Sequence, residues 1–242
     1  MGKKNKSDNG NNCINRNGEL RIKEKFELTE KQKQILEIGL DKNCRCLILD
    51  GKAGTSKTYL AILIALKLIG CKKANNLSYI RTSVQSKDGE LGFMPGNAEE
   101  KTAWMNEPFF EKLDELLTKP DVQNLVKEDK LKTFPSSMLR GVNLNGVAVM
   151  DECQNALIGT LETVMTRMTE HSLLILCGDS SGAQNDLGSK TGFKQLVEMF
   201  NNEDAIKMGI CLVNLGKEDV VRSKLTRFVV ETFEKYRANN IL

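Results

Sequence analysis

The stretch Gly51-Lys52-Ala53-Gly54-Thr55-Ser56-Lys57-Thr58 decides the fold of this chain of 242 residues. It follows the apolar run 46–49 and precedes a second apolar run at 59–66, so the pattern predicts a strand, a glycine-bearing loop and a helix. In such a loop, backbone N–H groups and the helix N-terminus point at a bound anion, and the helix dipole favours negative charge there. An ordinary β–α turn that contains glycine is the alternative interpretation.

The same loop carries the side chains that a phosphate-binding site needs. Lys57 would reach the β- and γ-phosphates of a nucleotide, and the Thr58 hydroxyl would bind Mg²⁺. The pattern requires glycine where Ser56 stands, and we expect a Cβ at this tightly curved position to weaken phosphate fit or turnover. The residues predicted to bind the nucleotide here are Gly51, Lys52, Ala53, Gly54, Thr55, Ser56, Lys57, Thr58 and Tyr59.

Composition bounds the class of protein. Hydrophobic residues make up 40% of the chain and charged residues 28%, as is typical of a soluble globular protein with a sizeable core. The net charge is +3, and residues 1–25 hold seven Lys and Arg against three acids, so the remainder is close to neutral. A near-neutral body argues against a broad DNA-coating surface, although it leaves room for a local basic groove.

Cysteine usage and apolar run lengths indicate the compartment. The seven cysteines form no Cys-x-x-Cys pair and their number is odd, so neither a disulfide framework nor a zinc site is predicted. No run of 18 apolar residues and no apolar signal segment is present. We therefore expect a cytoplasmic protein that does not contact a membrane.

The pattern of apolar runs predicts one domain behind a tail. Residues 1–25 are rich in Asn and Lys, and we expect a disordered basic tail because such a segment cannot bury enough surface to offset its ordering entropy. For residues 26–242 we predict a single α/β domain with a mostly parallel central sheet flanked by helices. Strands are expected at 46–49, 77–82, 131–135, 147–152, 173–177 and 209–215, and helices at 31–40, 57–69, 99–117, 156–170 and after 223.

A second chemical motif stands roughly 100 residues after the loop, where an apolar run ends in Asp151-Glu152. In nucleoside triphosphatases this arrangement places the first acid beside Mg²⁺ and lets the second polarise the attacking water. We therefore predict Thr58 and Asp151 as metal ligands and Glu152 as the catalytic base.

Two glutamines are further candidates for nucleotide contacts. Gln32 lies in the first turn of the helix that Thr29 caps, and its amide would pair with N6 and N7 of adenine. Gln184 follows the predicted strand 173–177 and would contact the γ-phosphate or the attacking water. A polar residue on a helix surface and an ordinary polar loop are the respective alternatives.

In their order and spacing these motifs resemble the PhoH-like proteins, a family of RecA-fold ATPases related to the first domain of superfamily 1 helicases. The similarity runs from about residue 26 to 237. Three departures are visible: Ser56 replaces a glycine, Lys52 replaces a proline, and four residues rather than two separate Asp179 from Gln184. The segments that carry the resemblance are 29–32, 51–61, Arg81, 90–96, 140–141, 151–155, 166–167, 178–187 and 219–222.

The resemblance implies a Mg²⁺-dependent ATPase with one RecA-like domain, ATP and Mg²⁺ as its cofactors, and Lys57, Glu152, Gln184 and Arg222 as its catalytic residues. Since one such domain supplies half of a helicase cleft, the missing cation is expected in trans from Arg222, with Arg167 and Arg140 as alternatives. This implies a homo-oligomeric ring such as a hexamer.

Several points stay open at the level of sequence. Single-stranded RNA or DNA is a candidate partner, and helicase activity is undecided. A nucleotide-binding switch or scaffold with little hydrolysis is the alternative function. Compact members rich in Asn and Lys are frequent in phages, so a phage-encoded protein acting in the host cytoplasm is one origin to consider.

Overall fold

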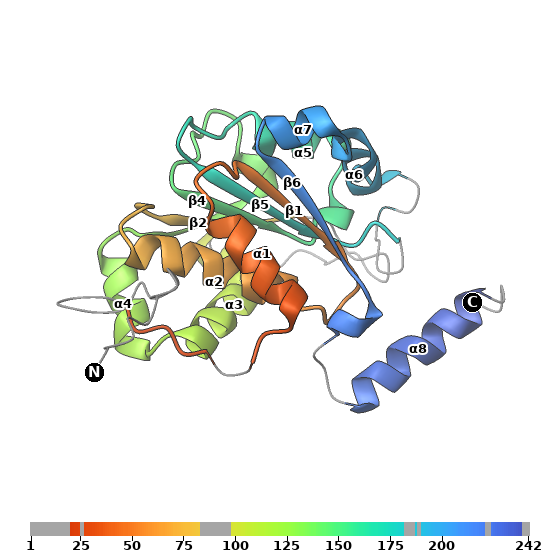
Figure 1. Cartoon of the computed structure of the whole chain (residues 1–242). Coiled ribbons are helices and arrows are strands. Elements are labelled where there is room, and N and C mark those ends of the chain that lie inside the picture. The colour runs from red at the N-terminus through yellow and green to blue at the C-terminus, as the bar shows by residue number, and fades with distance from the viewer. Residues whose placement is uncertain are drawn as a thin grey trace, which may run out of the picture.

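A computed structural model describes residues 20–24, 27–82, 98–181, 187, 190–220 and 224–238 (Figure 1). Its centre is a six-stranded sheet in the order β3-β2-β4-β5-β1-β6, in which every pair of neighbours is parallel. The strands are β1 (Cys46–Gly51), β2 (Leu77–Arg81), β3 (Leu131–Pro135), β4 (Val147–Asp151), β5 (Leu173–Gly178) and β6 (Ile210–Leu215). This confirms the prediction of a single α/β domain with a parallel central sheet.

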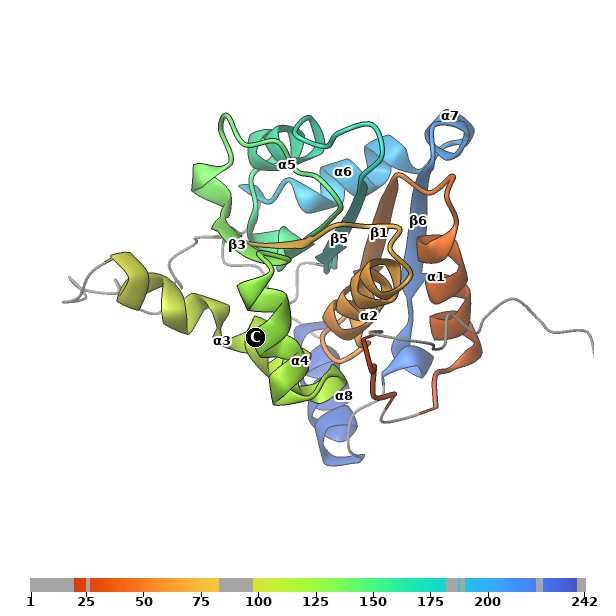
Figure 2. The same cartoon turned by 90° about the vertical axis from the view of Figure 1, so that its left-hand side faces the viewer.

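Helices cover both faces of this sheet. Figures 1 and 2 show α1 (Glu30–Leu40), α2 (Lys57–Gly70), α3 (Ala98–Leu116) and α4 (Lys119–Lys127) on one side. On the other side lie α5 (Ile158–Met165), α6 (Phe193–Phe200) and α7 (Glu203–Lys207). A parallel sheet that is covered on both faces reads as continuous apolar runs, which is why its strands are conspicuous in the sequence.

Alternate residues of each strand enter two separate apolar cores. On β1, Leu47 and Leu49 pack with α1 and α2, whereas Cys46 and Ile48 pack with α5 and α6. The helix α2 is buried almost all round from Tyr59 to Leu66. Burial of this helix between α1, α3 and the sheet fixes the loop that precedes it.

The element boundaries differ from the predictions in several places. The predicted helix 156–170 is shorter in the structure, where α5 spans Ile158–Met165 and the chain leaves the helix at Thr166. A separate 3-10 turn precedes it at residues 153–155. The helices α4, α6 and α7 were not predicted, since nine, eight and five residues give too little periodicity to read. In the part of the chain that the structure describes, no helix has the length and apolar character needed to cross a membrane.

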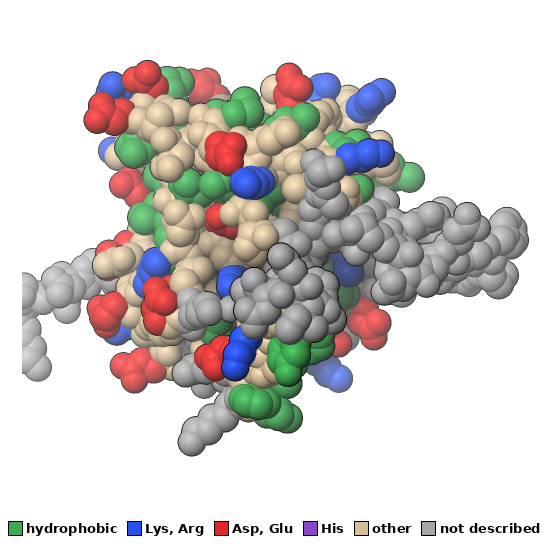
Figure 3. Space-filling view, turned by 90° about the vertical axis from the view of Figure 1, so that its right-hand side faces the viewer, with side chains coloured by type: hydrophobic (Ala, Val, Ile, Leu, Met, Phe, Trp, Pro, Cys, Tyr) green, Lys and Arg blue, Asp and Glu red, His purple; other side chains and the backbone are tan. Residues whose placement is uncertain are grey.

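The final helix, α8 (Lys224–Ala238), carries the predicted apolar stripe, but that stripe does not face the core. Leu225 is 71% exposed and Phe228 is 66% exposed. Figure 1 shows α8 standing away from the sheet. Figure 3 views the molecule from the right-hand side of Figure 1 and shows hydrophobic side chains gathered at its lower edge. The exposed stripe consists of Leu225, Phe228, Val229, Phe233 and Tyr236.

The segment before α1 and the cysteines bear on two further predictions. Residues 1–19 lie outside the described residues, so a disordered tail stays a prediction there. Within the predicted tail of residues 1–25, the backbone N–H of Lys23 donates to Leu116 O of α3 at 2.7 Å. Cys71 is disulfide-bonded, whereas the sequence indicated no disulfide framework. Free thiols are found at Cys44, Cys46, Cys153, Cys177 and Cys211.

Candidate functional site

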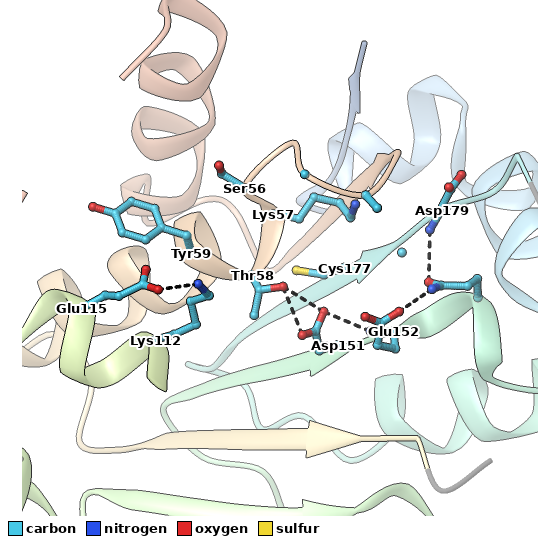
Figure 4. A pocket seen from close by; sticks show the side chains of 14 residues that line it. Ser56, Lys57, Thr58, Tyr59, Lys112, Glu115, Asp151, Glu152, Cys177 and Asp179 are labelled. Carbon is cyan, nitrogen blue, oxygen red and sulfur yellow. Dashed lines mark hydrogen bonds and ion pairs between the residues drawn. The ribbon is translucent and has the colours of Figure 1, made fainter. Parts of the chain in front are cut away.

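The carboxyl ends of β1, β4 and β5 meet at a pocket of about 380 Å³ (Figure 4). Because β5 lies between β1 and β4, the loops after all three strands converge, as expected at this edge of a parallel sheet. The pocket is lined by Ala53, Gly54, Ser56, Lys57, Thr58, Tyr59, Lys112, Glu115, Asp151, Glu152, Gln154, Cys177, Gly178 and Asp179. The structure therefore brings six residues of the predicted nucleotide-binding set together with both predicted acids.

The loop 51–58 begins with a close approach to β6 and contains two backbone positions with positive φ. Gly51 packs so closely on β6 that a Cβ would lie 2.7 Å from the Leu215 Cβ. Gly54 has φ +90°, and Ser56 has φ 64° and ψ 23°, which is the left-handed region. The expectation that Ser56 occupies a position suited to glycine is thus confirmed in the backbone angles.

Ser56 is also the residue that precedes α2, and its side chain makes no capping hydrogen bond. The first four N–H groups of a helix have no intrahelical partner, and the macrodipole adds positive charge at the same point. The pocket is lined by Ser56, Lys57 and Thr58 at this end of α2. The arrangement suits the oxygens of an anion.

Lys57 folds back over the loop. Its Nζ donates to Gly51 O at 2.5 Å and to Lys52 O at 3.0 Å. Figure 4 shows its amine above the pocket on the loop side. These two carbonyls hold the ammonium group at the rim of the pocket, within the same loop that would surround a phosphate.

Thr58 and Asp151 join the loop to the end of β4. The Thr58 hydroxyl lies 3.0 Å from each carboxylate oxygen of Asp151, and Tyr79 donates to Asp151 Oδ2 at 2.9 Å. Burial and the charge of Asp151 together raise the pKa of the Tyr79 phenol, so it remains a donor. A hydroxyl and a carboxylate are the hard oxygen ligands that Mg²⁺ prefers, and this donor set fits that ion.

Glu152 lies next to this pair in a strained conformation, with φ 55°. Burial, followed by the charge of Asp151, raises the pKa of its carboxyl group, while Gln154, Lys57 and Arg81 act in the opposite direction. A carboxylate with a raised pKa is a better proton acceptor near neutral pH than one in water. Strain at a non-glycine residue is often retained at functional sites.

Gln154 is the functional candidate to which the sequence assigned no role. It is almost fully buried, its Nε2 donates to Glu152 Oε2, and its Oε1 accepts the N–H of Asp179 at 3.2 Å. Thr191 donates to its backbone carbonyl at 2.6 Å. Its spacing from Glu152 was the available signal, but that spacing does not say which way the amide points.

Gln32 is buried, but it does not line the pocket. Its side chain closes a capping box with Thr29: the Thr29 N–H donates to Gln32 Oε1 at 3.1 Å, and the Gln32 N–H donates to Thr29 Oγ1 at 3.2 Å. Its Nε2 has no hydrogen-bond partner among the described residues. This unpaired donor suits a hydrogen bond to adenine, and that contact stays a prediction.

The other predicted site residues are Gln184, Arg222, Arg140 and Arg167. Gln184 and Arg222 lie outside the described residues, so their predicted roles are not tested. Arg140 is exposed. The backbone carbonyl of Arg167 accepts the N–H of Leu144 at 2.9 Å, close to the amino ends of β4 and β5, which is the edge of the sheet opposite the pocket. Arg167 therefore does not line the pocket.

The glycine-bearing loop after β1, the acid pair at the end of β4 and their common pocket define a protein of the P-loop nucleoside triphosphatase class. The family model described as PhoH-like protein matches residues 25–234. The chain belongs to this family, as its motifs indicated.

Relatives support the same family. The chain is 29% identical over 186 residues to the PhoH-like protein of Bacillus subtilis, covering 76% of this chain and 57% of that protein. It is 27% identical over 186 residues to Protein PhoH of Escherichia coli K12, covering 76% and 51%. The chain thus spans little more than half the length of these relatives.

The solved structures that align with this chain are more distant in sequence. The Pif1 helicase of Candida albicans aligns with a TM-score of 0.37 at 14% identity, covering 79% of this chain and 40% of that one. The large terminase of a thermophilic bacteriophage aligns with a TM-score of 0.43 at 10% identity, covering 83% and 48%.

Proposed function

We propose that this protein binds and hydrolyses ATP in a Mg²⁺-dependent reaction. The observation that carries the proposal is the meeting of Lys57, Thr58, Asp151 and Glu152 around one pocket, although Thr58 and Asp151 are 93 residues apart along the chain. Each side chain has the chemical type that phosphoryl transfer to water requires. The pocket volume is also in the range of small-molecule sites.

The described residues have separable tasks in this proposal. The loop and the start of α2 bind the phosphates, and Lys57 exchanges its bonds to the Gly51 and Lys52 carbonyls for phosphate oxygens. Thr58 and Asp151 would hold Mg²⁺, which supplies charge neutralisation of the phosphates when it is bound. Glu152 accepts a proton from the attacking water, aided by the raised pKa of its carboxyl group.

Gln32 is the proposed adenine contact. Its unpaired Nε2 would donate to N7 of the base, and its Oε1 keeps a second lone pair for the N6 amino group while it accepts from Thr29. A buried donor without a partner is costly, so an adenine that satisfies it would gain affinity.

We further propose that the active form is a homo-oligomeric ring. Among the described residues that line the pocket, the cations are Lys57 and Lys112, and none is an arginine. Stabilisation of the transition state by an arginine would then come from a neighbouring subunit, with Arg222 as the first candidate. ATP hydrolysis at the full rate by a monomer, measured alongside sedimentation, would contradict this part of the proposal.

The central test is the substitution Glu152→Gln, which keeps the shape of the side chain and removes its basicity. ATP binding, measured with a fluorescent analogue, should persist, while phosphate release should fall by about 100-fold or more. Unchanged turnover would exclude Glu152 as the base. Repeating the assay with single-stranded RNA or DNA at two salt concentrations tests whether nucleic acid stimulates hydrolysis.

A nucleotide-binding switch or scaffold with little hydrolysis is the second candidate function. The left-handed backbone of Ser56 favours it, because the strain lies in the loop that must enclose the phosphates. The two functions predict the same nucleotide binding and differ in the rate of phosphate release by the unmodified protein.

A further inference from the structure

The helix α3 brings a charged pair to the pocket that the proposed mechanism does not use. The ring of Phe109 stacks on Tyr79 with 4.6 Å between centroids and 12° between planes, and Tyr79 in turn donates to Asp151. Leu113 and Leu116 are fully buried behind it. These contacts fix the helix against the site, so the face one turn beyond Phe109 is held at the pocket.

Lys112 and Glu115 occupy that face and line the pocket. Lys112 Nζ lies 2.6 Å from Glu115 Oε1, and the two side chains are 35% and 37% exposed. Figure 4 shows the pair on the side of Thr58 and Tyr59, with Asp179 at the far side. The pair thus lies beside the residues expected to hold the metal and the phosphate chain.

The charges that line the pocket make this lysine significant. Among the described residues of the lining, Lys57 and Lys112 face four carboxylates, namely Glu115, Asp151, Glu152 and Asp179. A nucleoside triphosphate adds further negative charge to this surface. Lys57 is bonded to loop carbonyls, and Lys112 is bonded to a carboxylate that has no other role in the site.

We propose that Lys112 binds the phosphate chain of the nucleotide, and that Glu115 competes with the nucleotide for this lysine. The proposal deepens the proposed function and rests on it, because the phosphates must occupy the pocket. When the nucleotide enters, Lys112 exchanges Glu115 for phosphate oxygens, and Glu115 turns to solvent. The pair therefore sets the affinity for the nucleotide.

The competing account is that the two residues only stabilise the helix. Pairs three residues apart on a helix interact in many proteins, and such a pair contributes little to stability when it is partly exposed. The two accounts predict different changes in nucleotide affinity. If the pair only stabilises α3, then removing either partner has the same small effect on the helix and none on the nucleotide. If Glu115 competes with the nucleotide, then removing Glu115 and removing Lys112 change affinity in opposite directions.

The experiment measures the dissociation constant of a fluorescent ATP analogue with Mg²⁺ for the unmodified protein and for Lys112→Met, Glu115→Gln and the double variant. We expect Lys112→Met to weaken binding about three- to tenfold and Glu115→Gln to tighten it about two- to fivefold. The double variant should resemble Lys112→Met. Matched controls are Lys207→Met and Asp204→Asn on α7. These two residues are also three positions apart, form an ion pair at 3.0 Å and do not line the pocket. Neither control should change the dissociation constant.

The outcomes separate the two proposals. If the unmodified protein binds no nucleotide, the proposed function itself is wrong. If it binds nucleotide but Lys112→Met and Glu115→Gln leave affinity unchanged or shift it in the same direction, the role of the pair is excluded. Should Lys112→Met fail to fold in a thermal melt, Glu115→Gln decides alone: tighter binding supports the proposal, and equal or weaker binding overturns it.

Discussion

Thr58 and Asp151 lie side by side, with the hydroxyl of one 3.0 Å from both carboxylate oxygens of the other. Thr58 is in the first turn of the helix after β1, and Asp151 is the last residue of β4. This contact joins the two motifs on which the proposed function depends.

We expect Thr58→Ala to lose most Mg²⁺-dependent turnover, by about 100-fold, because the metal would lose one of its two protein ligands. Thr58→Ser keeps the hydroxyl and should retain activity within a few-fold. The measurement is the rate of phosphate release as a function of Mg²⁺ concentration. Equal rates for the Ala and Ser variants would remove Thr58 from the metal site.

The strain at Ser56 predicts a gain from glycine. Ser56→Gly should stabilise the fold by about 0.5–1 kcal/mol, since relief of the left-handed conformation exceeds the entropy that glycine adds to the unfolded chain. Turnover should rise as well if the Cβ hinders the fit of the phosphates. Chemical denaturation and phosphate release measure the two effects.

Lys72→Gly is the matched control for that substitution. Lys72 is exposed, has φ 58° and does not line the pocket, so its replacement should alter stability without altering turnover. If Ser56→Gly behaves like this control, the serine does not limit hydrolysis, and slow turnover by the unmodified protein then needs another cause.

Gln154 should act on the rate rather than on binding. Gln154→Met removes the donor to Glu152 and leaves the N–H of Asp179 without its acceptor, at a cost of about 1–3 kcal/mol in stability. We expect kcat to fall about tenfold because Glu152 is less well oriented, with KM within about twofold. Steady-state kinetics give both constants.

Thr191→Val provides the comparison for Gln154. It removes a hydrogen bond to the Gln154 backbone carbonyl but leaves the side-chain amide in place. If this variant lowers kcat as much as Gln154→Met does, then packing of the turn, and not orientation of Glu152, explains the loss.

Tyr79 supports the metal site through Asp151. Tyr79→Phe keeps the stack on Phe109 and removes one hydrogen bond to the carboxylate, so the Mg²⁺ midpoint of activity should rise about tenfold. Phe109→Ala instead leaves a cavity and should cost about 3–5 kcal/mol in stability. If the Mg²⁺ midpoint rises in both variants in proportion to their loss of stability, the phenol has no specific role.

Local signals in the sequence were sufficient for much of the fold and for the candidate residues that meet at the pocket. The apolar runs at β1, β4 and β5 were legible because strands buried on both faces need apolar residues at consecutive positions. The loop 51–58 and Asp151-Glu152 were legible because phosphate and metal chemistry restrict the residue types allowed at each position. The prediction that Ser56 replaces a glycine required only the loop pattern.

The contacts between distant residues were decided by the tertiary structure alone. Gln154 bonds to both Glu152 and Asp179, and Lys112 reaches the pocket from α3, because the strand order places the ends of β4 and β5 together and packs Phe109 on Tyr79. The same holds for α8, whose apolar stripe was visible in the sequence while its exposure was not. Periodicity reports which face of an element is apolar, but only the packing of the whole chain determines what that face meets.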